Sequence, residues 1–110
     1  MTTLNTTPES ASITMVSIVV GSSVPTIGQF YQPGNVNSTV GSKVNWVIND
    51  TAPHTTTSGT VKNNRSTPTD AFDSTLKNSG DSFPFIFNKA GEYAYYCTTH
   101  PWMTGKVTIS

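Results

Sequence analysis

The chain has 110 residues, a length that suits a single domain with one hydrophobic core. Charged residues make up 11% and the formal net charge is zero, which argues against nucleic acid as a partner because binding phosphates needs a basic face. The single cysteine excludes an internal disulfide, a Cys-x-x-Cys redox pair and a four-cysteine zinc or iron–sulfur site.

Residues 1–10 are polar and show no periodicity, so we interpret them as a flexible leader or the stub of a linker, followed by one domain over 11–110. From residue 12 onward, short β-prone segments alternate with turn residues, and no helical pattern is longer than a turn. The segment 62–70 reads as polar and irregular, and 70–74 as a loop or short turn. The segments expected to form strands are 12–20, 35–40, 43–49, 55–61, 81–88, 92–97 and 105–109.

Two of these segments indicate which face of the strand is buried. Val44, Trp46 and Ile48 alternate with polar or less bulky neighbours, which is typical of a half-buried strand. Phenylalanine occupies every second position from 83 to 87 and predicts a second apolar strand face. About seven to eight short strands at regular spacing predict an all-β fold, an antiparallel β-sandwich with Greek-key connections.

The segment 95–105 holds the only cysteine and one of the two histidines of the chain. Cys97, His100 and Met103 are each separated by two residues, so one tight loop carries a thiolate, an imidazole and a thioether. Copper uses this donor set in electron-transfer sites, where two histidines and one cysteine form a plane with a weak axial methionine. The second histidine would have to be His54, which follows a predicted strand, and strand ends gather at the same pole of a sandwich. The alternative is that Cys97 is a small buried hydrophobic residue.

A larger set of residues between 40 and 110 follows the pattern of a known family. These residues are Gly41, Val44, Trp46, Asn49, Asp50, Pro53, His54, Phe72, Asp73, Ser74, Gly80, Phe87, Gly91, Tyr93, Tyr95, Cys97, His100, Pro101, Trp102, Met103 and Gly105. On them the stretch resembles the plastocyanin-like cupredoxins, which are small blue type 1 copper proteins. The compact loop Cys-Thr-Thr-His-Pro-Trp-Met is similar to the amicyanin pattern Cys-Thr-Pro-His-Pro-Phe-Met, and halocyanin-type proteins are similar too.

The resemblance implies an electron-transfer protein that is not an enzyme. One copper ion would alternate between Cu(I) and Cu(II), with His54, Cys97 and His100 as ligands and Met103 as the axial ligand. Two alternatives stay open at this point: a type 1 copper site open enough to act on a small molecule such as nitric oxide, and a copper-binding carrier module. With only two histidines, the chain has no set of three for the additional copper centre of copper nitrite reductases.

The expected partners are redox proteins that bind transiently through an apolar patch at His100, Pro101 and Trp102. No segment approaches the roughly 18 apolar residues of a membrane span, and the start of the chain lacks the basic and apolar regions of a signal peptide. The resemblance implies an exported domain, periplasmic, pseudoperiplasmic or at the cell surface, whose signal or upstream anchor lies outside this sequence.

Two departures from the family pattern lead to specific expectations. Thr55 stands where many members have asparagine after the first ligand histidine, and we expect this change to loosen the tie between the two ligand loops. Thr99 stands where related loops have proline. Since proline has no N–H group, we expect the Thr99 N–H to donate an additional hydrogen bond to the sulfur of Cys97, besides one from the Thr55 N–H.

Overall fold

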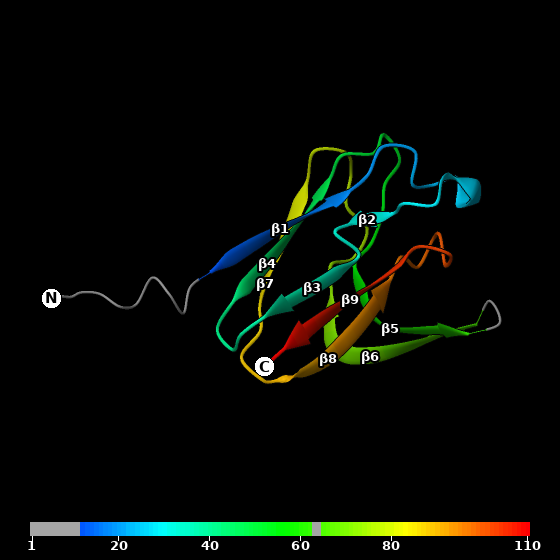
Figure 1. Cartoon of the computed structure of the whole chain (residues 1–110). Coiled ribbons are helices and arrows are strands. Elements are labelled where there is room, and N and C mark those ends of the chain that lie inside the picture. The colour runs from blue at the N-terminus through cyan, green and yellow to red at the C-terminus, as the bar shows by residue number, and fades with distance from the viewer. Residues whose placement is uncertain (1–11, 63–64) are drawn as a thin grey trace, which may run out of the picture.

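The computed structural model describes residues 12–62 and 65–110, which form two β-sheets packed face to face (Figure 1). One sheet has the order β2-β1-β4-β7 and the other the order β3-β9-β8-β5-β6. The strands are β1 (Ile13–Ile18), β2 (Tyr31–Gln32), β3 (Asn35–Ser38), β4 (Lys43–Ile48), β5 (Thr57–Lys62), β6 (Arg65–Asp73), β7 (Ser82–Ile86), β8 (Gly91–Tyr96) and β9 (Thr104–Ile109). The predicted all-β sandwich is confirmed, and the predicted leader over 1–10 lies outside the described residues.

The helical structure in the described ranges is one 3-10 turn, η1 (Pro25–Ile27), between β1 and β2. Nothing in these ranges is a helix long and apolar enough to cross a membrane.

Strand β6 is the largest difference from the sequence prediction, which expected irregular structure over 62–70. Residues 65–73 instead form the nine-residue strand β6, which pairs antiparallel with β5. Its first six side chains are all exposed, so the strand shows neither the apolar alternation nor the apolar run by which strands are recognised in a sequence. Strand β6 lies at the edge of the sheet, and its extended conformation is stabilised by backbone pairing with β5 and not by burial of its side chains.

Two strand pairs run parallel, although the sequence predicted an antiparallel sandwich. β1 pairs parallel with β4, and β3 pairs parallel with β9. The chain leaves the first sheet after β2, adds β3 to the second sheet and returns as β4. A parallel neighbour needs such a crossover connection, and here the opposite sheet supplies it.

Trp46 lies at the centre of the core between the sheets. Its side chain is 1% exposed, and its ring stacks on Phe83 and meets Tyr95 edge-on at centroid distances of 5.7 and 5.2 Å. Val44 and Ile48 are buried on the same face of β4, which confirms the predicted alternation. The same apolar cluster includes Cys97 and Met103. The predicted ligand loop is therefore anchored in the core.

We expect Trp46→Ala to lower the free energy of unfolding by about 3–5 kcal/mol, because it empties a large buried site among other aromatic rings. Denaturant titration of the copper-free protein measures this loss. Ile86→Ala is the matched control, since Ile86 lies in the same sheet but is 49% exposed, and exposed positions change stability by about 0.5 kcal/mol or less. Equal losses in the two variants would show that the aromatic cluster is not the main support of the core.

Candidate metal centre

The predicted ligands come from two segments that leave the second sheet at the same end. Strand β5 pairs with β8 through Thr57 opposite Tyr96. Because the two strands are antiparallel, the segment before β5 and the segment after β8 emerge side by side. His54 lies on the first segment, and Cys97 begins the second.

The backbone of His54 is fixed from the other side by Lys77. The His54 N–H donates to the Lys77 carbonyl at 3.0 Å, and the Lys77 N–H donates to the His54 carbonyl at 2.9 Å. The imidazole therefore projects from a residue whose backbone N–H and carbonyl are both hydrogen-bonded to Lys77.

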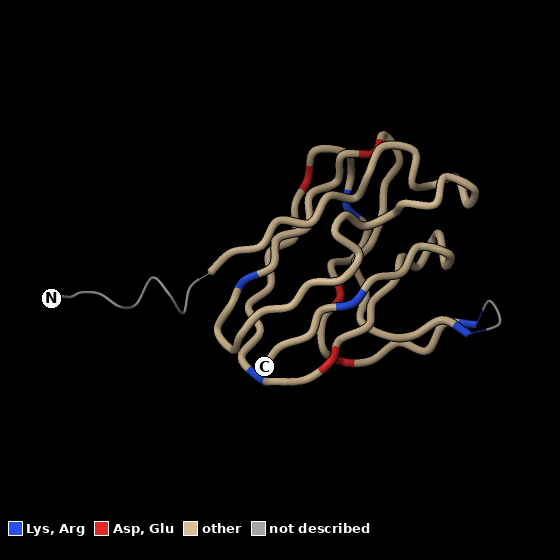
Figure 2. The backbone as a smooth tube through the Cα atoms, in the orientation of Figure 1, with Lys and Arg blue, Asp and Glu red and all other residues tan. Residues whose placement is uncertain are grey.

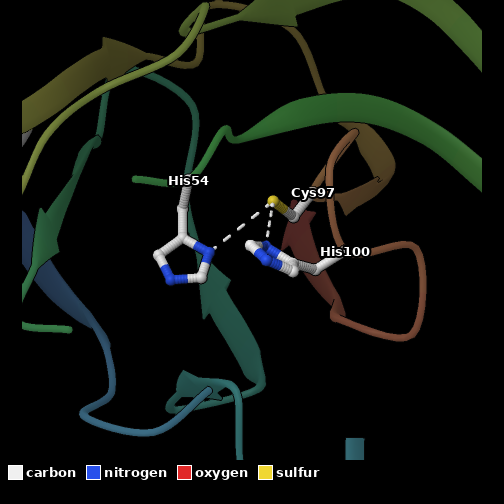
Figure 3. Close-up of side chains that lie close together, drawn as sticks. All are labelled: His54, Cys97 and His100. Carbon is white, nitrogen blue, oxygen red and sulfur yellow. Dashed lines mark hydrogen bonds between the residues drawn. The ribbon is translucent and has the colours of Figure 1, made fainter. Parts of the chain in front are cut away.

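His54, Cys97 and His100 converge on one point (Figure 3). The Cys97 Sγ atom lies 3.7 Å from His54 Nδ1 and 3.5 Å from His100 Nδ1, and the three donor atoms lie within 4.8 Å of one another. His54 and Cys97 are completely buried, whereas His100 is partly exposed. The structure thus brings together three of the four residues predicted to form the site.

Met103 closes the loop that carries Cys97 and His100. Its N–H donates to the His100 carbonyl at 2.9 Å, and its carbonyl accepts from the Cys97 N–H at 3.2 Å. The side chain is fully buried in the same apolar cluster as Cys97. The role of Met103 as the axial ligand stays a prediction.

Thr55 ties the two ligand segments together, contrary to the expectation that it would loosen them. Its N–H donates to Cys97 Sγ at 3.4 Å, as predicted, and its hydroxyl oxygen accepts from the Thr98 N–H at 2.9 Å. The Tyr31 hydroxyl donates to the Thr55 carbonyl at 2.9 Å. A short hydroxyl side chain is enough here because the pairing of β5 with β8 already brings the segments close.

Thr99 contacts the sulfur through its side chain, so the prediction that its N–H would donate was wrong. The Thr99 hydroxyl lies 3.2 Å from Cys97 Sγ and 3.1 Å from His100 Nδ1. The chain turns at this point, with the His100 N–H donating to the Cys97 carbonyl at 3.3 Å, and this turn places the Thr99 side chain beside the sulfur.

Asp50 follows the family pattern in the sequence without a predicted role, and its carboxylate lies against the other nitrogen of His54. The distance from Asp50 Oδ2 to His54 Nε2 is 2.7 Å, and Asp50 is 2% exposed. Asp50 precedes His54 by four residues in a connection without periodicity, so no pattern in the sequence pointed to this contact.

The environment of Cys97 favours the thiolate, which is the form that binds metals. Burial raises the pKa of the thiol, but hydrogen bonds from His54, the Thr99 hydroxyl, the Thr55 N–H and His100 together lower it to about 5. Burial lowers the pKa of His54, whereas Cys97 and Asp50 raise it, and the net shift is upward. Burial likewise raises the pKa of Asp50, but the Gly21 N–H, His54 and the Thr51 N–H lower it overall, so this carboxyl group is charged.

The donor set fits copper. One thiolate and two imidazole nitrogens are the soft and borderline ligands that copper binds in a trigonal arrangement. Both histidines turn Nδ1 toward the sulfur, so their metal-binding atoms are oriented in the same sense (Figure 3).

In the copper-free protein we expect Cys97 to titrate near pH 5 rather than near its ordinary value of 9.0, because surrounding donors stabilise the thiolate. The ultraviolet absorbance of the thiolate, followed against pH, measures this pKa. Thr99→Ala should titrate at a higher pH than the parent because one donor is lost, whereas Thr104→Ala, an exposed threonine on β9, should match the parent. An absorbance that rises only near pH 9 in the parent would contradict the expectation.

Comparisons with known proteins agree with this geometry. Residues 19–110 match the copper binding proteins of the plastocyanin/azurin family. The amicyanin of Paracoccus versutus is 33% identical over 81 residues, which cover 72% of this chain and 57% of that protein. Amicyanin-alpha of Methylorubrum extorquens is 32% identical over 79 residues, covering 72% and 63%. The matched region thus spans less than two thirds of these two relatives.

Among solved structures, a purple cupredoxin from Nitrosopumilus maritimus is 36% identical, with a TM-score of 0.78 over 88% of this chain and 99% of that one. A reduced amicyanin variant shares the fold, with 20% identity and a TM-score of 0.66 over 90% of this chain and 83% of that one. From the family match, the relatives and the cluster of His54, Cys97 and His100, we conclude that the chain belongs to the plastocyanin/azurin family of copper-binding proteins.

Proposed function

We propose that this protein is an electron carrier with one type 1 copper ion, bound by His54, Cys97 and His100 and axially by Met103. The observation that carries the proposal is the convergence of three donor atoms within 4.8 Å at one end of the sandwich. Copper bound there supplies a one-electron couple between Cu(II) and Cu(I). Within the described residues, no feature favours the alternatives of a site acting on nitric oxide or a copper carrier module.

The residues around the site hold the donor atoms in place. Two buried ligands, His54 and Cys97, are fixed through Thr55, whose N–H and hydroxyl oxygen both bond to the Cys97 segment. A site that keeps its shape suits electron transfer, because the same ligands must serve both oxidation states. The burial of these ligands also keeps bulk water away from the metal position.

We propose further that redox partners dock transiently at His100, Pro101 and Trp102. His100 is the partly exposed member of the ligand cluster, and Trp102 is 37% exposed with its Nε1–H donating to the Ser22 carbonyl at 3.3 Å. This bond joins the ligand loop to the loop around η1, where Val24 and Ile27 are also exposed. A partly exposed ligand candidate beside the exposed Trp102 ring fits a small interface that forms and dissociates quickly.

The two loops of the proposed docking site carry no charged side chain that would steer a partner from a distance. Lysine, arginine, aspartate and glutamate are absent from residues 19–34 and 97–105, and both loops are free of charged colours in Figure 2. Long-range attraction between charges accelerates association, so we expect association here to depend only slightly on salt.

We also propose that the domain works outside the cytoplasm, in a periplasmic or pseudoperiplasmic space or at the cell surface.

One equivalent of Cu(II) added to the copper-free protein should produce an intense visible band from charge transfer between the Cys97 thiolate and copper. Cys97→Ser should abolish this band but keep the circular dichroism spectrum of the parent, since the core between the sheets does not depend on the metal. A parent without the band would contradict the proposed site, and a Cys97→Ser variant with the same band would contradict the ligand assignment.

Met103→Leu should keep the intense band and raise the reduction potential, because the axial bond is long and weak and its loss removes a donor to Cu(II). The change nearly conserves side-chain volume, so the core should tolerate it. Protein-film voltammetry measures the potential. Met15→Leu is the control, since Met15 is a 53% exposed methionine on β1 and its replacement should leave the potential unchanged. Loss of copper binding in Met103→Leu would show that Met103 does more than an axial ligand does.

A further inference from the structure

The second ring nitrogen of His54 is held by a buried carboxylate. Asp50 Oδ2 lies 2.7 Å from His54 Nε2, and the two residues are 2% and 0% exposed. Among the described residues, Asp50 is the only buried acidic side chain. The contact lies on the side of the ring that faces away from Cys97, since Nδ1 is the atom nearest to the sulfur (Figure 3).

The backbone orients the Asp50 carboxylate independently of His54. The N–H groups of Gly21 and Thr51 both donate to Oδ1 at 2.9 Å, which leaves Oδ2 for His54 and for the Ser22 hydroxyl at 3.5 Å. The ion pairs of the described residues give Asp50 no lysine or arginine partner. Burying a carboxylate without a permanent cation is costly. The side chain that faces Asp50 Oδ2 is His54, which is a candidate metal ligand.

This arrangement determines which nitrogen of His54 is available to a metal. A charged carboxylate accepts hydrogen bonds but donates none, so the proton of the neutral imidazole resides on Nε2 and Nδ1 keeps its lone pair. A carboxylate in this position also makes the imidazole a stronger donor. The negative charge favours the more highly charged Cu(II) over Cu(I), and this preference lowers the reduction potential.

We propose that Asp50 is a positioning residue of the copper centre, which holds His54 with Nδ1 toward Cys97 and lowers the reduction potential through its buried charge. The inference rests on the proposed function, because it takes His54 as a copper ligand. It makes the two ligand histidines unequal, since the Nδ1 of His100 meets a hydroxyl and the sulfur and no carboxylate of the described residues is bonded to His100.

The test compares Asp50→Asn with the parent. The amide keeps the shape but removes the charge, and because its single oxygen is held by the Gly21 and Thr51 N–H groups, its NH2 group faces His54 Nε2 and the hydrogen bond to His54 is lost as well. We expect the thiolate band to persist, the Cu(II) affinity to fall by about 10- to 100-fold, as is typical when an outer partner of a metal ligand is lost, and the Cu(I) affinity to change much less. The potential should rise, and each tenfold change in the ratio of the two affinities corresponds to about 59 mV.

Asp70→Asn is the matched control, because Asp70 is an exposed aspartate on β6 and its replacement removes the same charge from the surface. Its potential should stay close to that of the parent. If Asp50→Asn shifts the potential no more than Asp70→Asn does, the inference is overturned while the copper proposal stands. If the parent itself lacks the thiolate band, the proposed function fails and the inference fails with it.

Nuclear magnetic resonance of the Cu(I) parent provides a second readout that needs no variant. The ring proton of His54 should lie on Nε2, be shifted downfield by the carboxylate and exchange slowly with water. A proton on Nε2 that exchanges freely, or an imidazole bound to copper through Nε2, would overturn the inference even if Asp50→Asn failed to fold. Where Asp50→Ala folds, this slowly exchanging signal should disappear.

Discussion

The site depends on the short pairing between β5 and β8. The register of β5 on β8 comprises two pairs, Thr57 with Tyr96 and Ser58 with Tyr95. This short contact sets the distance between the two segments that carry His54 and Cys97. Beyond the strand ends, Thr55 continues the connection with hydrogen bonds to Thr98 and to the sulfur. Without the pairing, the donors would belong to two independent loops, and fixing their distance would cost conformational entropy in both.

The position of the site at the edge of the core explains its combination of polarity and burial. Cys97 and Met103 belong to the apolar cluster around Trp46, while His54 is surrounded by Asp50, Ser22 and backbone groups. Buried polar groups are stable only when hydrogen-bonded, and the contacts with Ser22 and with the Lys77 backbone join His54 to two other segments of the chain. The same bonds that satisfy the polar atoms therefore also fix the relative positions of the segments.

The sequence predicted the features that follow from regular patterns. The alternation in β4 identified the buried face with Trp46, and the spacing of the segment 97–103 identified the loop whose Cys97 and His100 meet His54. Strand β6 could not be predicted because its exposed side chains carry no apolar periodicity. The parallel pairs depend on how the chain crosses between sheets, which is a property of the whole topology and not of any segment.

The polar contacts around the ligands were the least predictable part of the site. A hydrogen bond depends on distances of a few tenths of an ångström and on side-chain rotamers, which residue types alone do not specify. Thr55 and Thr99 were recognised as departures from the family pattern, but the roles of their hydroxyl groups were not predicted. The Thr55 hydroxyl oxygen accepts from the Thr98 N–H, and the Thr99 hydroxyl, not its N–H, contacts the sulfur of Cys97. Asp50 became visible only once the fold placed it beside His54.

The hydrogen bond from the Cys97 N–H to the Met103 carbonyl closes the ligand loop upon itself. Cys97, His100 and Met103 therefore belong to one covalent and hydrogen-bonded unit, whereas His54 belongs to the framework of the sandwich. Insertions or deletions between 97 and 103 would move several donors at once and leave the framework histidine in place. The loop and the sandwich can consequently vary separately in evolution. Changes in the loop would alter the positions of its donor atoms, while the sandwich preserves the fold and the position of His54.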